Sequence, residues 1–164
     1  MSTGGRKIHI IGTAHTLQKR AVGAGSPSAA EAELAKVICQ SALACGAKLV
    51  AEEMSIEGLG DGASSIAQEA ATSIGVPHLF CDPTYAERTD LALLERSADC
   101  GDARRESEWL QRIAGRDAFP LLMICGANHV DPFTRMCSEA GYEVIVIEPD
   151  WAPQIPTPLE RRFI

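Results

Sequence analysis

Hydrophobic residues occur along the chain as short runs that alternate with segments of helical periodicity. The run KIHIIG at 7–12 is rich in β-branched residues and ends at Gly12, which is typical of a strand that meets a turn. Residues 28–45 follow a Ser-Pro-Ser start signal, carry apolar side chains at helical spacing, and stop before Gly46. This first segment predicts a strand, a loop and a helix in succession.

The same alternation continues to the C-terminal region. Further strands are predicted at 47–53, 76–82, 119–126 and 142–149, and helices at 62–75, at 84–115 with an interruption at 98–102, and at 131–141. The strands are nearly continuous apolar runs, a pattern that indicates burial on both faces of a parallel sheet. We therefore expect a three-layer α/β fold with about five mostly parallel strands flanked by helices.

The chain has 164 residues, a length that fits a single domain spanning 1–164. The last segment, WAPQIPTPLERRFI at 151–164, contains three prolines and is expected to be an extended tail and not another helix. Such a tail would serve as a strap or as a dimer contact, so a homo-oligomer is one possibility.

Composition and charge restrict the classes of partner. The formal net charge is −7 and the basic residues are scattered, so the chain lacks the positive track that a nucleic-acid backbone requires. No apolar run approaches the roughly 20 residues that span a bilayer. The six cysteines lack C-x-x-C spacing and lie mostly in apolar segments, which predicts reduced, buried thiols. We therefore expect a cytoplasmic protein that binds neither nucleic acid nor membrane.

Polar residues that could bind a metal or act in catalysis follow the predicted strands. In a parallel α/β sheet the ligands bind at the carboxyl ends of the strands, where the loops diverge. The histidines and acids found at these positions are His15, Glu52, Glu53, Asp82 and His129. Both histidines occur as Gly-x-x-His, and we expect the two imidazoles and the acids to meet at one edge of the sheet.

Two neutral imidazoles and a carboxylate can hold a divalent metal while leaving positions open for water and substrate. The glycines let the backbone turn sharply and expose N–H groups that suit an oxyanion. Either Glu52 or Glu53 alone also fits a capped turn or a solvated loop. The residue types therefore predict a metal site without deciding between the two glutamates.

Ordinary structural roles compete for several other residues. Asp82 fits a helix N-cap, Arg88 fits a surface position, and Arg105 lies in ARRESEWLQRI, which fits an exposed helix with i, i+4 ion pairs. His9 and His78 lie away from the carboxyl ends of their strands, so both are expected to be structural.

Four segments together resemble one family. They are IIGTAH, LVAEEM, RRESEWLQRI and MICGANHVDPFTRMCSEAGYEVIVI, and their order and rough spacing resemble the TraB/Tiki superfamily with its erythromycin-esterase and ChaN-like relatives. The resemblance implies that His15 and His129 are the motif histidines, that Glu53 is the acidic residue, and that Arg105 is the helix arginine. Arg104 and Glu106 replace the glutamate and asparagine that flank this arginine in the family.

Members of this superfamily include metal-dependent proteases, an antibiotic esterase and iron- or haem-related binding proteins. The resemblance thus implies a hydrolase that acts on a small molecule or short peptide, with Mn, Co, Zn or Fe bound by His15, Glu53 and His129. Arg88 or Arg105 would stabilise a developing negative charge, and Asp82 would act as a base or as a further ligand.

Other functions fit the same residues. The site could bind a metal or ligand without turnover, or a histidine could act as general base in a metal-free, esterase-like hydrolase. A nucleotide-binding Rossmann domain is a weaker alternative, because GTAHTLQ lacks the G-x-G-x-x-G pattern.

Overall fold

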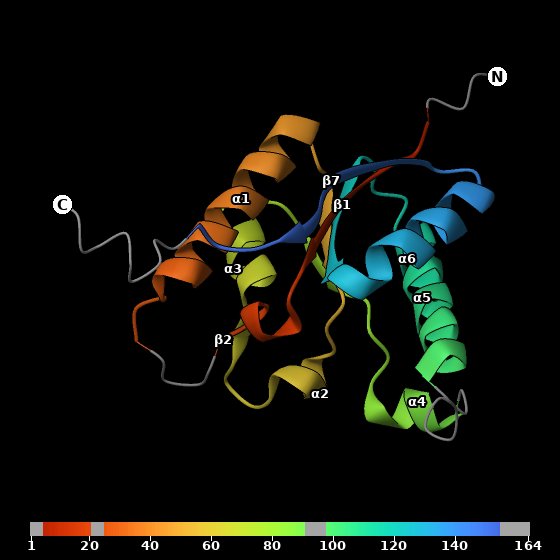
Figure 1. Cartoon of the computed structure of the whole chain (residues 1–164), viewed down its shortest axis with the longest axis horizontal. Coiled ribbons are helices and arrows are strands. Elements are labelled where there is room, and N and C mark those ends of the chain that lie inside the picture. The colour runs from red at the N-terminus through yellow and green to blue at the C-terminus, as the bar shows by residue number, and fades with distance from the viewer. Residues whose placement is uncertain (1–4, 21–24, 91–97, 155–164) are drawn as a thin grey trace.

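The computed structural model describes residues 5–20, 25–90 and 98–154, and its centre is a five-stranded sheet whose strands are all parallel (Figure 1). The strand order is β5-β3-β6-β1-β7. The strands are β1 (Lys7–Thr13), β3 (Leu49–Glu52), β5 (His78–Phe80), β6 (Leu121–Gly126) and β7 (Glu143–Trp151). The predicted α/β class with about five parallel strands is confirmed.

Helices cover both faces of this sheet, as Figure 1 shows. Helices α1 (Ala29–Cys45) and α3 (Ile66–Ser73) pack on one face, and α5 (Ala98–Ala114) and α6 (Ala127–Glu139) pack on the other. The shorter elements are a 3-10 turn η1 (His15–Leu17), helices α2 (Ile56–Leu59) and α4 (Tyr85–Asp90), and a separate antiparallel pair, β2 (Lys19–Arg20) with β4 (Ser64–Ser65).

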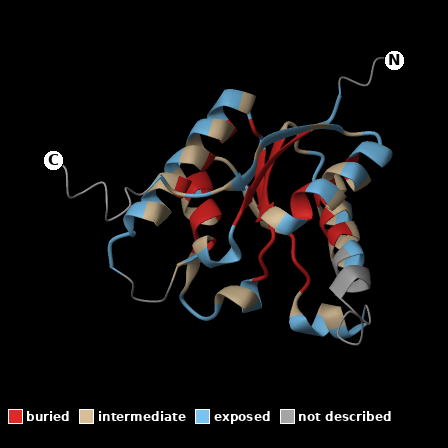
Figure 2. Cartoon of the chain, in the orientation of Figure 1, coloured by how far each residue is buried: buried red, intermediate tan, exposed pale blue. Residues whose placement is uncertain are grey.

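The core consists of two apolar layers, one on each side of the sheet (Figure 2). Along β6, Leu121 and Met123 face one layer while Leu122 and Ile124 face the other, because successive strand residues point to opposite faces. The whole of β6 is buried. This central strand therefore matches the continuous apolar pattern read from the sequence.

Helix α1 begins and ends where the sequence predicts. Ser28 accepts a hydrogen bond from the backbone N–H of Glu31, whose side chain bonds back to Ser28, so the two form a capping box. Gly46 ends the helix in the left-handed conformation with φ 63°, which glycine adopts without steric cost.

Strand β7 corrects the expectation that every strand is buried on both faces. It lies at one edge of the sheet and pairs only with β1 in the described part of the chain. Ile145, Val146 and Ile147 are exposed as a result. An apolar run predicts a strand, but it does not reveal that the strand has a neighbour on one side only.

Three expected boundaries also change. The interruption expected at 98–102 is wrong, because α5 begins at Ala98 and runs through this stretch. Helix α6 begins at Ala127 and not at 131, so His129 lies on a helix and not in a loop. Trp151 belongs to β7, while 155–164 of the predicted tail lie outside the described residues.

The cysteines whose side chains are described are all free, as expected: Cys39, Cys45, Cys81, Cys125 and Cys137, of which the last three are buried. Cys100 lies outside the residues with described side chains. Among the described helices, none is both long and apolar enough to cross a membrane.

Candidate metal centre

The carboxyl ends of three neighbouring strands bring the predicted ligands together. His15 follows β1 in η1, Glu53 follows β3 directly, and His129 lies in the first turn of α6 after β6. Since β3, β6 and β1 are adjacent in the sheet, these ends share one edge. One ligand atom from each residue lies within 4.8 Å of the other two, so the group could hold a metal ion.

Two of these side chains are fixed in the interior and the third is open to solvent. Glu53 Oε1 lies 3.3 Å from His129 Nε2 and 3.6 Å from His15 Nε2. The side chains of Glu53 and His129 are 1% and 7% exposed, whereas that of His15 is 59% exposed. A small molecule can therefore reach the group from the His15 side.

The Glu53 carboxylate is held from two directions. The backbone N–H of Gly126 donates to its Oε2 at 2.7 Å, and Arg105 Nη2 donates to its Oε1 at 2.8 Å. The Gly126 N–H is thus bonded to a carboxylate. The expectation that this N–H group is exposed to bind an oxyanion is therefore wrong.

A glycine is required at 126 because the His15 ring lies directly over it. A Cβ atom at this position would lie 2.5 Å from His15 Nε2, well inside normal contact distance. The glycine of the second Gly-x-x-His motif therefore makes room for the histidine of the first.

Glu106 orients His129, and sequence reasoning did not assign it a role. Its Oε1 lies 2.7 Å from His129 Nδ1, and its side chain is buried. The Trp109 ring packs edge-on against the imidazole, with centroids 5.1 Å apart. A signal for Glu106 was present, since it precedes Trp109 by three positions on a helix and so shares its core-facing side.

Asp82 anchors two arginines at the same cavity that His15 lines. Its Oδ1 accepts from Arg105 Nε at 3.0 Å and from Trp109 Nε1 at 3.1 Å, and its Oδ2 pairs with Arg88. Asp82 is not part of the converging His/Glu/His group. Arg105 is mostly buried, so the exposed-helix alternative for this residue is wrong.

The N-cap alternative for Asp82 is also wrong. At the start of α4 the hydroxyl of Thr84 accepts from the backbone N–H of Glu87, and the Glu87 carboxylate accepts from the N–H of Thr84 at 2.7 Å. This backbone hydrogen bond, helped by Arg112, lowers the pKa of Glu87.

Glu52 points away from the group, which distinguishes the two adjacent glutamates. It is fully buried, and its Oε1 accepts from the hydroxyl of Ser65 and lies 2.8 Å from His78 Nε2. Glu52 and His78 therefore pair with each other, outside the group formed by His15, Glu53 and His129. His9 is buried in β1, and this burial lowers its pKa.

Cys125 lies next to Gly126 but does not belong to the converging group of His15, Glu53 and His129. It is fully buried and packs in the apolar layer that contains Trp109 and Phe133. Burial, together with the charges of Glu53 and Glu106, raises the pKa of this thiol well above its usual value.

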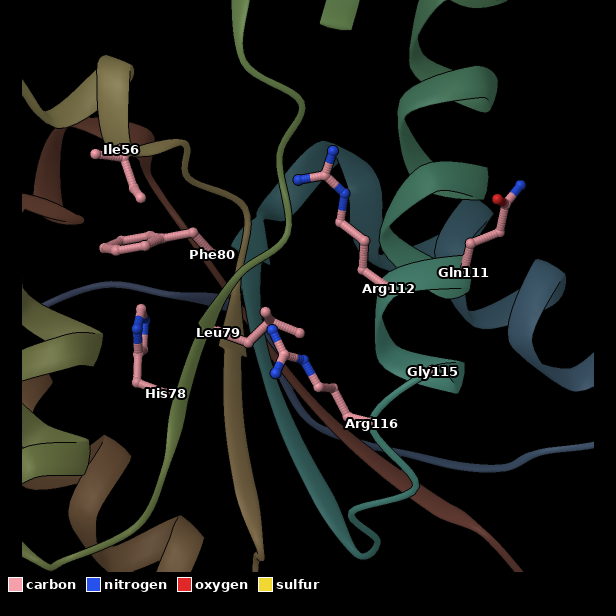
Figure 3. A pocket seen from close by; sticks show the side chains of 8 residues that line it. All are labelled: Ile56, His78, Leu79, Phe80, Gln111, Arg112, Gly115 and Arg116. Carbon is pink, nitrogen blue, oxygen red and sulfur yellow. The ribbon is translucent and has the colours of Figure 1, made fainter.

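A cavity of about 300 Å³ opens beside the His/Glu/His group, and its lining includes His15, Lys19, Glu53, Asp82, Arg88 and Arg105. A larger cavity of about 580 Å³ lies along the edge strand β5 (Figure 3). Its lining includes Leu79 of β5, Arg112 of α5 and Arg116 in the turn after that helix. The larger cavity is lined by none of the three candidate ligands, so the smaller one is the candidate reaction site.

Comparisons with protein-family models, curated proteins and solved structures give no match for this chain. An all-parallel α/β fold supports many unrelated chemistries. The function must therefore be argued from the residues of the site.

Proposed function

We propose that this chain is a metal-dependent hydrolase that acts on a small molecule or a short peptide. His15, Glu53 and His129 would hold one divalent ion, with Mn, Co, Zn and Fe as candidates. Two imidazoles with one carboxylate form a donor set of catalytic metal sites, in which further positions stay open for water and substrate.

One observation carries the proposal: two imidazole nitrogens and one carboxylate oxygen converge at the carboxyl ends of three neighbouring strands, all within 4.8 Å of one another. Glu53 Oε1 lies 3.3 Å from His129 Nε2 and 3.6 Å from His15 Nε2. On its other side the His129 ring contacts the buried carboxylate of Glu106 at 2.7 Å. A carboxylate behind a histidine is the usual support of a metal ligand.

A divalent ion bound here would bring the pKa of a coordinated water close to neutrality and would polarise a substrate carbonyl. The residues of the chain have complementary tasks. Glu106 holds His129 in orientation, and Arg105 holds the Glu53 carboxylate and balances part of its charge. Arg88 is 32% exposed and lines the cavity, so it is the arginine that is positioned to stabilise an anion developing on the substrate.

Metal-free hydrolysis is the second candidate, and the position of Arg105 favours it. The guanidinium lies 2.8 Å from Glu53 Oε1, the oxygen that also faces both histidines, and so neutralises this carboxylate without an ion. A protonated His129 would also bridge Glu53 and Glu106, whose carboxylate oxygens lie 3.3 Å and 2.7 Å from its two ring nitrogens. In this scheme His15, which is exposed, would be the general base that activates water.

Metal analysis separates the two candidates. We expect the purified protein to bind one equivalent of Zn²⁺ or Co²⁺ by calorimetry, and His15→Ala and His129→Ala each to abolish tight binding. His9→Ala is the matched control, since His9 lies within β1 away from the group. Hydrolysis of an ester and peptide panel that resists chelators would select the metal-free scheme. Hydrolysis that survives both site changes would contradict both schemes.

A further inference from the structure

The cavity beside the His/Glu/His group has the opposite charge to the chain as a whole. Its charged lining consists of the cations Lys19, Arg88 and Arg105 and the carboxylates Glu53 and Asp82, so three against two leaves one positive charge. The whole chain carries −7. A local reversal of this kind attracts anions to one place on an otherwise acidic surface.

The two carboxylates of the cavity are turned inward and already paired. Glu53 is bonded by Gly126 and Arg105, and Asp82 by Arg105, Arg88 and Trp109. The side chains of Glu53 and Asp82 are only 1% and 6% exposed. A molecule that enters therefore meets the cationic side chains and not the carboxylates.

Lys19 contributes the most accessible of these charges. Its backbone is fixed by the pairing of β2 with β4, while its side chain is exposed at the cavity. The next residue, Arg20, is bound to Glu69 at 3.0 Å, but no described carboxylate lies within ion-pair distance of Lys19. The ammonium group is thus available to a ligand, beside the partly exposed Arg88.

We propose that the substrate of this site is a small organic anion whose carboxylate or phosphate group is bound by Lys19 and Arg88. The inference deepens the proposed function and rests on it, because it takes the cavity as the substrate site. A volume of about 300 Å³ suits a small molecule. A divalent ion on the histidines would add positive charge and so strengthen the same preference.

Matched anionic and neutral probes test the charge preference. A titration with Zn²⁺ first measures metal binding. Calorimetry then measures the affinities of metal-free and Zn²⁺-loaded protein for two matched pairs of ligands, succinate with succinamide and glycerol phosphate with glycerol. We expect at least one anion to bind about tenfold more tightly than its neutral counterpart, and added salt to weaken its binding. The two pairs distinguish a carboxylate from a phosphate ligand.

Two lysine variants then separate a local from a general effect of charge. Lys19→Ala is expected to weaken the preferred anion about three- to tenfold, the effect of one charge a few ångströms away in a partly hydrated site. Lys36→Ala removes the same charge from an exposed position on α1, outside the cavity lining, and should leave binding unchanged.

The outcomes distinguish this inference from the proposed function. Tight Zn²⁺ binding without any preference for an anion, or equal losses in the two lysine variants, overturns the inference and leaves the metal site intact. Absence of Zn²⁺ binding contradicts the metal site. In that case the metal-free protein still tests the inference. A preference for an anion that Lys19→Ala weakens and Lys36→Ala does not supports the inference, and the absence of such a preference overturns it.

Discussion

Gly126→Ala tests the close approach between the two Gly-x-x-His motifs. Gly126 has φ −61° and ψ 142°, which any residue adopts, so the backbone tolerates alanine at this position. The added Cβ would lie 2.5 Å from His15 Nε2 and 2.9 Å from His15 Cε1. Since non-bonded heavy atoms need about 3.5 Å, the ring must retreat by about 1 Å.

A retreat of this size removes His15 from the ligand group. Metal–ligand distances in genuine sites stay within about 0.2 Å of their normal values, so a displaced ring no longer coordinates. We expect Zn²⁺ affinity to fall at least about 10- to 100-fold, the range seen when only the support of a ligand is lost. The free energy of unfolding should fall by only about 1 kcal/mol, because His15 is 59% exposed and swings into solvent without leaving a cavity. That small loss reflects the remaining contact of the Cβ, 3.2 Å from Oε2 of the buried Glu53, which must shift by a few tenths of an ångström.

Calorimetry with Zn²⁺ and urea denaturation followed by tryptophan fluorescence measure the two quantities separately. Gly115→Ala is the matched control, because a Cβ there meets nothing closer than 3.5 Å and lies at the end of α5. Unchanged Zn²⁺ affinity in Gly126→Ala would refute the reasoning, since His15 could then not be a ligand in this geometry.

Three further predictions concern the support of the site and the core. Glu106→Ala should lower Zn²⁺ affinity about 10- to 100-fold, because it releases His129. If calorimetry gives the variant and the unchanged protein the same Zn²⁺ affinity, Glu106 does not orient a metal ligand. Gly12→Ala should destabilise folding by about 1–3 kcal/mol, measured by urea denaturation, because its Cβ would overlap the backbone carbonyl of Pro149; an unchanged midpoint would contradict this overlap. Burial raises the pKa of Cys137 from 9.0 to about 12, so the stability that it contributes is complete below pH 9 and is lost as pH rises toward 12. Urea midpoints across this range should decline less steeply in Cys137→Ala, and parallel declines would argue against it.

The position of the site could be predicted because sheet topology leaves little freedom. Once β1, β3 and β6 are recognised as parallel strands, the residues after them must lie at one edge. His15, Glu53 and His129 follow these strands and do meet. The prediction needed only the order of the elements, which the apolar runs and glycines supply.

Contacts made by helices could not be predicted in the same way. The pairing of Glu106 with His129 depends on the rotation of α5 about its axis and on the start of α6 at Ala127, before the expected boundary. Asp82 was assigned to catalysis because it ends a strand, but the arginines that engage it come from α4 and α5. Sequence patterns fix which face of a helix is apolar, but not which polar group it meets.

The adjacent glutamates explain why burial alone does not identify a metal ligand. Both side chains are buried, and a buried carboxylate is costly unless donors surround it. At Glu52 the hydroxyl of Ser65 and the imidazole of His78 supply ordinary donors to one oxygen. At Glu53 both oxygens also have donors, Arg105 at Oε1 and Gly126 at Oε2, while Glu52 Oε2 has no described partner. The convergence of the His15 and His129 rings on Glu53 Oε1, and not its burial or a missing donor, therefore marks Glu53 as the candidate ligand. The exposed His15 ring places this group at an edge that solvent and ions can reach.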